Sequence, residues 1–347
     1  MKAAVLKQYR KIEWDDVPTP SISPIQVLIK IKYASICGSD QHIFNGDFHP
    51  RTKLPLIPGH EFNGEIVEIG KKIKNHRKGD LVAVDPIIWC GECPSCKIGH
   101  YPACTSLKLL GIDLDGGFGE YIAVEEHMLY KTGANIPASH AALIEILSIG
   151  FHACNRASVS QQNTIAIWGA GKVGQSILQA ARTRTNNTIF MVDPIADRLK
   201  IAQKTYSDVI TINPFDTDPV ATIKEYTKGK GVDIAFEAVG HARSIDGRLN
   251  PVRSCIQVIR GAGTVCVLGL GDEPSPLIMK ELIWKEAKIV ASRVSHGEFA
   301  ETIRQLEAGK LKPEALISDI LPAFEAQKGF ELLENEPEKH LKILLEF

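Results

Sequence analysis

Apolar and polar residues follow two different patterns along the chain. In the N-terminal part, residues 1 to about 36 alternate in the manner of β-strands, with Val27, Ile29 and Ile31 facing one way and Lys30 and Lys32 facing the other. A further apolar strand is indicated at 66–69, before Gly70. Short alternating strands of this kind predict an antiparallel, barrel-like domain.

From about residue 163, short apolar runs alternate with amphipathic helical segments. We expect strands at 164–168, 189–192, 232–236, 263–269 and 288–291. Strands and helices alternating at this spacing predict a parallel, doubly wound sheet. The last segment contains one amphipathic helix and a final apolar strand at 343–345, and we expect it to rejoin the first domain because the sheet is complete without it. The expected domains are 1–150 with 296–347, and 151–295.

Length and charge restrict the class of protein. A chain of 347 residues suggests two domains. Its formal net charge is −1 and it contains no basic run, which argues against a nucleic-acid partner. The start of the chain is charged before any apolar run could form a signal peptide, and no segment reaches the roughly 18 apolar residues of a membrane span. We therefore expect a cytoplasmic protein with no membrane partner.

Four of the eight cysteines are clustered with the spacing Cys-x2-Cys-x2-Cys-x7-Cys. They are Cys90, Cys93, Cys96 and Cys104. Thiolates at this spacing can close a tetrahedral zinc site, and four protein ligands leave no open position, so the site would be structural. The alternative is a set of disulfides, although thiols only three residues apart form such bridges poorly.

A second set of metal-ligand types precedes this cluster. Cys37 follows an apolar strand, and His60 and Glu61 stand at the entrance to the next strand. A thiolate, an imidazole and a carboxylate can hold a catalytic zinc and leave one position open. Taken singly, Cys37 reads as a small buried apolar residue, and His60 and Glu61 as a solvated ion pair.

Glu145 is an acidic residue in an apolar helical segment that we expect at 141–153. A carboxylate is rarely buried without a partner, and a metal or a water on a metal would be one. The alternative is that Glu145 faces solvent on an amphipathic helix.

The second domain opens with a dinucleotide fingerprint. Gly169, Gly171 and Gly174 stand between a strand and a helix, where backbone amides can bind a pyrophosphate. Asp193 ends the next strand, at the place where an acid bonds the ribose 2′-hydroxyl and repels a 2′-phosphate. This pattern favours NAD over NADP. The alternative for Asp193 is a turn residue before Pro194.

These motifs together resemble the zinc-containing medium-chain dehydrogenase family over nearly the whole chain, and most closely its polyol and sugar-acid branch. The resemblance implies an α/β protein with a GroES-like β-barrel catalytic domain and a Rossmann domain. It also implies a catalytic zinc at Cys37, His60 and Glu61, with Glu145 as a direct ligand or as the holder of the zinc water. Two departures are Ile146 after this acid, where the branch usually has proline, and Lys172-Val173 within the fingerprint, where Pro-Ile is frequent.

The resemblance further implies roles in the reaction. Zinc would act as a Lewis acid on the substrate hydroxyl, Ser39 would take the proton, and His42 would pass it outward. The alternatives are a helix N-cap for Ser39 and a surface histidine for His42. The implied cofactor site includes Lys172, Val173 and Arg198. The implied quaternary structure is a homodimer or homotetramer.

The expected substrate is a secondary alcohol of a polyol, sugar acid or sugar phosphate. Arg293, just after the last strand of the cofactor domain, suits a carboxylate, although it could equally bond the cofactor or backbone. L-threonine is an alternative substrate. Rival classes are a non-catalytic dinucleotide-binding sensor and a zinc-free quinone-type reductase on the same scaffold.

Overall fold

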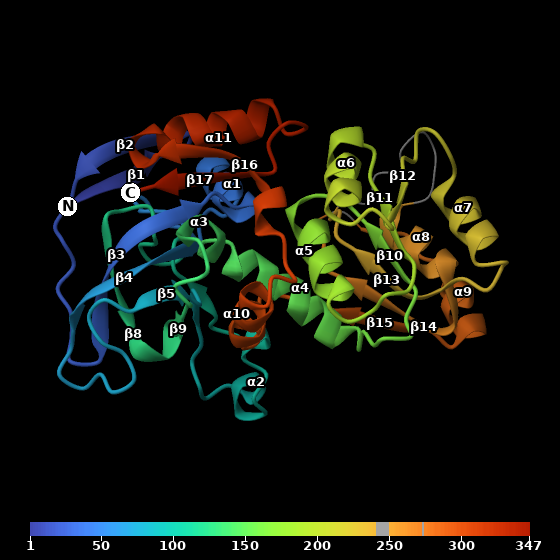
Figure 1. Ribbon diagram of the computed structural model, residues 1–347, viewed down its shortest axis with the longest axis horizontal. Coiled ribbons are helices and arrows are strands. Elements are labelled where there is room, and N and C mark those ends of the chain that lie inside the picture. The colour runs from blue at the N-terminus through green and yellow to red at the C-terminus, as the bar shows by residue number, and fades with distance from the viewer. Residues whose placement is uncertain (241–249, 273) are drawn as a thin grey trace. The chain divides into compact units, whose positions relative to one another are not determined.

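The computed structural model describes residues 1–240, 250–272 and 274–347. Their contacts divide the chain into two compact units (Figure 1). Unit 1 comprises Met1–Glu145, Phe299–Gly309 and Ile317–Phe347, and unit 2 comprises Ile146–Glu298 and Lys310–Leu316. Among the described residues, none of the helices combines the length and apolar character that a membrane crossing requires.

Unit 1 is built on a seven-stranded sheet that is almost entirely antiparallel, as the alternating pattern predicted. The strand order is β16-β17-β3-β4-β5-β9, with β8 also paired to β3, and only β16 and β17 run parallel. Its main elements are β1 (Lys2–Gln8), β2 (Lys11–Asp16), β3 (Gln26–Ser35), α1 (Gly38–Asn45), β4 (Glu61–Ile69), β5 (Leu81–Val84), β6 (Ile87–Ile88), α2 (Pro94–Lys97), β7 (Lys108–Leu109), β8 (Tyr121–Glu125), β9 (Leu129–Lys131), α3 (Ala138–Ala141), α10 (Phe299–Glu307), β16 (Ile317–Pro322), α11 (Ala326–Asn335) and β17 (Lys342–Glu346).

The register of three neighbouring strands brings distant parts of unit 1 together. Ser35, the last residue of β3, pairs with Glu61 at the start of β4 on one side and with Leu344 of β17 on the other. The apolar core beneath these strands includes the fully buried Ile29 and Ile343. The end of β3 therefore lies between the candidate metal ligands and the C-terminal strand.

Unit 2 contains the predicted parallel sheet, with the order β12-β11-β10-β13-β14-β15. Strand order reverses beside β10, as in doubly wound folds. Its elements are β10 (Ile165–Trp168), α5 (Lys172–Arg182), β11 (Ile189–Val192), α6 (Ala196–Thr205), β12 (Ile210–Ile212), α7 (Pro219–Tyr226), β13 (Val232–Glu237), α8 (Pro251–Val258), β14 (Ile259–Val267), α9 (Met279–Lys285) and β15 (Lys288–Ala291).

The helical segment expected at 141–153 differs in detail from the prediction. A short helix α3 ends at Ala141, and a separate helix α4 (Ile144–Arg156) begins three residues later. The interruption places Glu145 in the first turn of α4 rather than in a helix interior.

Candidate functional site

Cys37 lies in the short connection between β3 and α1, where it occupies the N-cap position of the helix. Oδ2 of Asp40, one turn into α1, accepts a hydrogen bond from the Cys37 backbone N–H at 2.8 Å. This acid at the third helical position satisfies an amide at the start of α1 that has no partner within the helix. Asp40 therefore fixes the turn that presents the Cys37 thiol.

His60 and Glu61 stand where a glycine turn enters β4. Gly59 has φ +97°, and a Cβ there would overlap the ring of Phe118, so only glycine fits this turn. One ligand atom from each of Cys37, His60 and Glu61 lies within 4.8 Å of the other two. The structure thus brings together the three residues that the sequence singled out, and their donor types fit a catalytic zinc.

Asp40 also lies against His60. Its Oδ1 is 3.3 Å from Nδ1 of His60, and both side chains are buried. Burial disfavours the imidazolium, but the charges of Asp40 and Cys37 outweigh this effect and raise the pKa of His60 well above its usual value. With Nδ1 turned to Asp40, Nε2 is the ring nitrogen left for a metal.

Glu145 is buried, with 5% of its surface exposed, as the main interpretation of the sequence expected, and the alternative that it faces solvent is wrong. Burial, together with the charge of Glu61, raises the pKa of Glu145 to about 8. Its Oε2 has no hydrogen-bond partner among the described residues. An orphaned buried carboxylate oxygen is costly, and a cation would relieve that cost. Glu145 is not a member of the three-residue group above, so its carboxylate oxygens do not lie within 4.8 Å of all three ligand atoms.

Lys342, the first residue of β17, forms an ion pair with Glu61 that the sequence did not reveal. Its Nζ donates to both carboxylate oxygens, and both side chains are fully buried. Burial opposes charge on both groups, but their mutual attraction prevails, so the pKa of Glu61 is lowered and that of Lys342 is raised. The one available signal was a lysine directly beside the apolar run 343–345.

Ser39 and His42 are three residues apart in α1 and so share one face of it. Ser39 is the second helical residue, which leaves the N-cap position to Cys37. His42 is largely exposed; its Nδ1 lies 2.7 Å from Oδ2 of Asp47, and its ring stacks on Phe48 with centroids 5.7 Å apart. This helix face could lead a proton from a half-buried hydroxyl to the surface.

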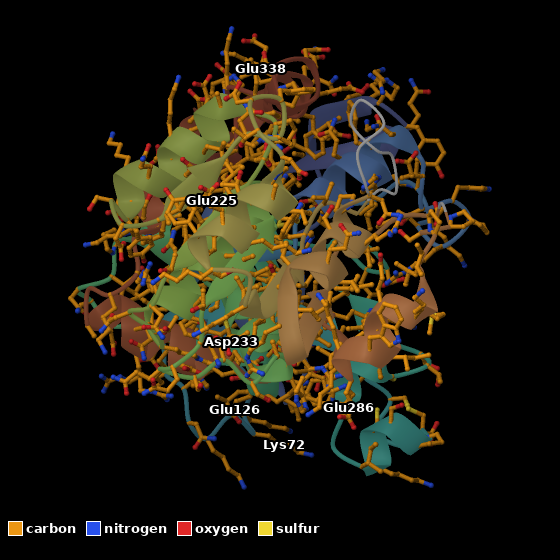
Figure 2. All side chains as sticks on the ribbon, turned by 90° about the vertical axis from the view of Figure 1, so that its right-hand side faces the viewer. Lys72, Glu126, Glu225, Asp233, Glu286 and Glu338 are labelled. Atoms are coloured by element: carbon orange, nitrogen blue, oxygen red, sulfur yellow. The ribbon has the colours of Figure 1, made fainter. Side chains whose placement is uncertain are left out.

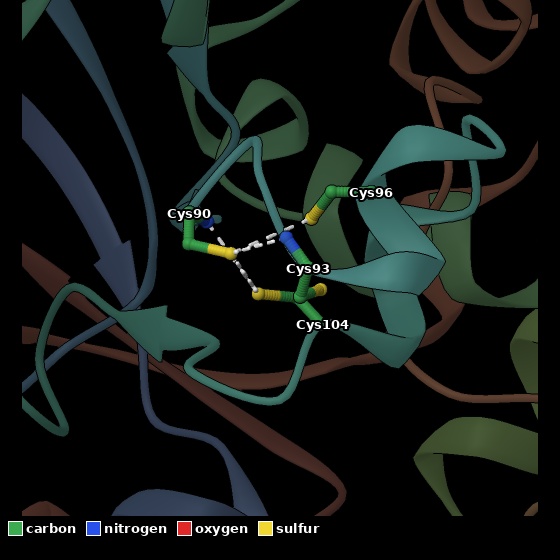
Figure 3. A group of neighbouring side chains, drawn as sticks. All are labelled: Cys90, Cys93, Cys96 and Cys104. Atoms are coloured by element: carbon green, nitrogen blue, oxygen red, sulfur yellow. Dashed lines mark hydrogen bonds between the residues drawn. The ribbon is translucent and has the colours of Figure 1, made fainter.

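The four clustered cysteines converge around α2 (Figure 3). Sγ of Cys90 lies 3.5 Å from Sγ of Cys104 and 4.0 Å from that of Cys96, and all four thiols are free. The backbone amides of Cys96 and Thr105 lower the pKa of Cys93 to about 6, whereas burial raises that of Cys96 to about 12. Four thiols within 4.8 Å of one another fit a tetrahedral zinc.

The glycine fingerprint connects β10 to α5. A Cβ on Gly174 would overlap the carbonyl oxygen of Gly169, whereas a Cβ on Gly171 would meet only Nη1 of Arg198, at 3.9 Å. Gly174 is therefore required for packing, and Gly171 leaves space for a group to approach the backbone closely. Lys172 and Val173, both half-buried, form the first turn of α5.

Asp193 follows β11 and is 4% exposed. Its Oδ2 accepts a hydrogen bond from the backbone N–H of Ala170 at 2.7 Å, and its Oδ1 accepts one from Ile195 at 2.8 Å. The carboxylate thus fastens the glycine loop to the end of β11. Arg293, which is exposed, follows β15 at the same carboxyl edge of the parallel sheet. This is the edge at which doubly wound sheets bind ligands.

Two family models match the chain. One describes an alcohol dehydrogenase GroES-like domain and matches residues 23–137. The other describes a zinc-binding dehydrogenase and matches residues 173–308.

Individual relatives match over almost their full length. The chain is 33% identical to L-threonine 3-dehydrogenase of Caldanaerobacter subterraneus, over 96% of each chain. It is 31% identical to sorbitol dehydrogenase of Bacillus subtilis, over 99% of this chain and 97% of the relative. A crystal structure of an Escherichia coli alcohol dehydrogenase, rspB, in complex with NADH superposes with a TM-score of 0.91 at 29% identity, covering 100% of this chain and 99% of the other.

Proposed function

The chain belongs to the zinc-binding alcohol dehydrogenase family, and from that membership we propose that it oxidises a secondary alcohol and transfers the hydride to NAD. The observation that carries this proposal is the buried group of Cys37, His60 and Glu61 in unit 1, with the orphaned Oε2 of Glu145 nearby in the same unit. A non-catalytic sensor would have no need to keep these groups together.

The chain's own residues would divide the work as follows. Cys37 and His60, with a carboxylate from Glu61 or Glu145, would hold zinc, which when bound acts as a Lewis acid on the substrate hydroxyl. Ser39 would accept the hydroxyl proton, and His42 would pass it to solvent. Asp40 would keep His60 in the orientation and tautomer needed for metal binding.

We assign the catalytic domain to unit 1 and the cofactor domain to unit 2. Gly171 would admit the pyrophosphate of NAD to the start of α5, with Lys172, Val173 and Arg198 beside it. Asp193 would accept hydrogen bonds from the ribose hydroxyls, in addition to those from the two backbone amides that it already binds, and its charge would repel a 2′-phosphate. The cysteine cluster would hold a second, structural zinc.

The substrate class that we propose is a polyol, sugar acid or sugar phosphate, since the relatives include a sorbitol dehydrogenase. Arg293 is the candidate for an anionic group of such a substrate. L-threonine is the second candidate, because a threonine dehydrogenase is 33% identical to the chain. Incubation of the purified protein with NAD and a panel of polyols, hexonates, sugar phosphates and threonine, following NADH formation, tests both.

We also propose a homo-oligomer that resides in the cytoplasm. Strand β15 ends the sheet of unit 2, and Ile289 on it is 42% exposed. Ile283 and Trp284 on the preceding helix α9 are 71% and 76% exposed, and Glu286, the residue after this helix, is labelled in Figure 2. An apolar edge strand invites pairing, and a second copy would cover it.

A further inference from the structure

Lys342 is buried in a position where a lysine is rarely found. Its side chain and that of Glu61 are both fully inaccessible to solvent, and the residues are 281 positions apart in the sequence. Lysine is almost never fully buried unless it is paired, because a buried ammonium group loses its hydration. The β17–β3–β4 register, in which Ser35 lies between Leu344 and Glu61, places the two charges together.

The partner of this lysine is itself a candidate metal ligand. An oxygen of Glu61 lies within 4.8 Å of the ligand atoms of Cys37 and His60, yet Lys342 donates to both oxygens of that carboxylate. Charge-assisted hydrogen bonds of this kind are about twice as strong as neutral ones. A cation bound at Cys37 and His60 would have to share Glu61 with Lys342.

The competition for Glu61 affects the number of metal ligands because Glu145 is a second carboxylate that could bind the same metal. Its buried carboxylate lies close enough to Glu61, His60 and Lys342 to interact with their charges, and its Oε2 has no hydrogen-bond partner among the described residues. A zinc that bound Cys37, His60 and both carboxylates would have four protein ligands and no open position. Catalysis requires that one position stay available to the substrate. One carboxylate must therefore be held only weakly by the metal.

We propose that Lys342 is a positioning residue that competes with the catalytic metal for Glu61 and so keeps one coordination position available to the substrate. The inference rests on the proposed zinc-dependent function. It assigns different tasks to the two carboxylates: Glu61 is tethered to Lys342 and leaves the metal readily, whereas Glu145 has no such tether. Lys342 does not touch the substrate; it acts through Glu61.

The test compares variants by zinc release to a colorimetric chelator and by turnover. In Lys342→Met, Glu61 loses its tether and binds the metal, so release of the catalytic zinc slows by about tenfold or more, the value of one charged hydrogen bond. Turnover falls because the open position is closed. Lys342→Arg keeps the positive charge, so its rate of zinc release and its turnover should stay close to those of the wild type. Zinc release from the four-cysteine cluster is an internal reference, and Lys339→Met, at an exposed site, should match the wild type.

The double variant Lys342→Met with Glu61→Gln separates this inference from a purely structural role. Replacing both buried partners by neutral groups avoids an unpaired charge, so this variant should fold even if the single variant does not. We expect it to retain two zincs per chain and to regain turnover. Loss of the catalytic zinc from the double variant, or faster zinc release from Lys342→Met, would overturn the inference. Wild-type protein without zinc or turnover would instead refute the proposed function.

Discussion

The Oδ1 atom of Asp40 lies 3.3 Å from Nδ1 of His60, and both residues are buried. The other oxygen of Asp40 holds the backbone amide of Cys37. A single carboxylate therefore positions two candidate metal ligands that are 23 residues apart in the chain.

This relationship predicts the effect of Asp40→Ala. The substitution frees the His60 ring and leaves the Cys37 amide unbonded, so affinity for the catalytic zinc should fall by about ten- to a hundredfold. Competition with a chelator of known affinity measures the change. Asp272→Ala, at an exposed acid in unit 2, is the control and should bind zinc as the wild type does. Unchanged zinc affinity in Asp40→Ala would remove Asp40 from the site.

Zinc binding to the metal-free protein should depend on pH. The pKa of His60 is raised well above its usual value and that of Glu145 is raised to about 8, so both groups hold protons at pH 7 in the absence of metal. A metal must displace these protons, so the apparent affinity rises with pH from 6 to 8 and zinc binding releases protons. Titration calorimetry in buffers of different ionisation enthalpy counts them. Zinc uptake without proton release would contradict the geometry.

The cysteine cluster should hold its metal independently of the catalytic site. Cys104→Ala removes one of four ligands, so the protein should lose one of two zincs and unfold at a lower temperature. Metal analysis and thermal denaturation measure the two effects. Cys255→Ala, at a buried cysteine of unit 2, should keep both zincs. Stability that depends on reducing agent rather than on metal would favour disulfides.

Asp193→Ala should weaken NAD binding and reduce the preference for NAD over NADP. The variant loses the proposed ribose contact and the bonds that fasten Ala170 and Ile195, so the KM for NAD should rise by about tenfold or more. Steady-state kinetics with both cofactors provide the measurement, and Asp197→Ala on the exposed face of α6 is the control. An unchanged ratio of kcat/KM for the two cofactors would show that Asp193 only supports the loop.

Ile289→Lys should disrupt the proposed oligomer. A charge on the exposed edge of β15 opposes pairing with another strand, so the variant should have a lower mass in solution than the wild type. Light scattering coupled to gel filtration measures this mass. Ile25→Lys, at an equally exposed isoleucine of unit 1, should leave it unchanged. A wild-type protein that is itself monomeric would refute the proposed assembly.

The sequence predicted the two types of sheet because each has its own pattern of apolar and polar residues along the strand. Alternation around Val27 to Ile31 and the continuous apolar runs around Ile167 and Met191 match β3, β10 and β11 closely. The candidate ligand set was also accessible, since Cys37, His60 and Glu61 are recognisable by their chemistry and by their positions beside strands.

What the sequence could not supply were contacts set by register and burial. In the sequence, Lys342 resembles any lysine at the start of a strand. Only the pairing of β17 with β3 brings its ammonium group into contact with the carboxylate of Glu61. The interruption between α3 and α4 was hidden in an uninterrupted apolar segment, so the sequence did not show that Glu145 lies in the first turn of a helix. In the same way, the hydrogen bond that the backbone N–H of Ala170 donates to Asp193 depends on how β11 ends beside the glycine loop.

The most direct test of the proposed function is NADH formation by the purified protein before and after removal of the catalytic zinc. With NAD and the panel of polyols, hexonates, sugar phosphates and threonine, we expect turnover of at least one secondary alcohol. That turnover should disappear when the zinc at Cys37 and His60 is removed, and it should return when zinc is restored. Turnover that survives zinc removal, or that is confined to unbranched primary alcohols, would contradict the proposed function.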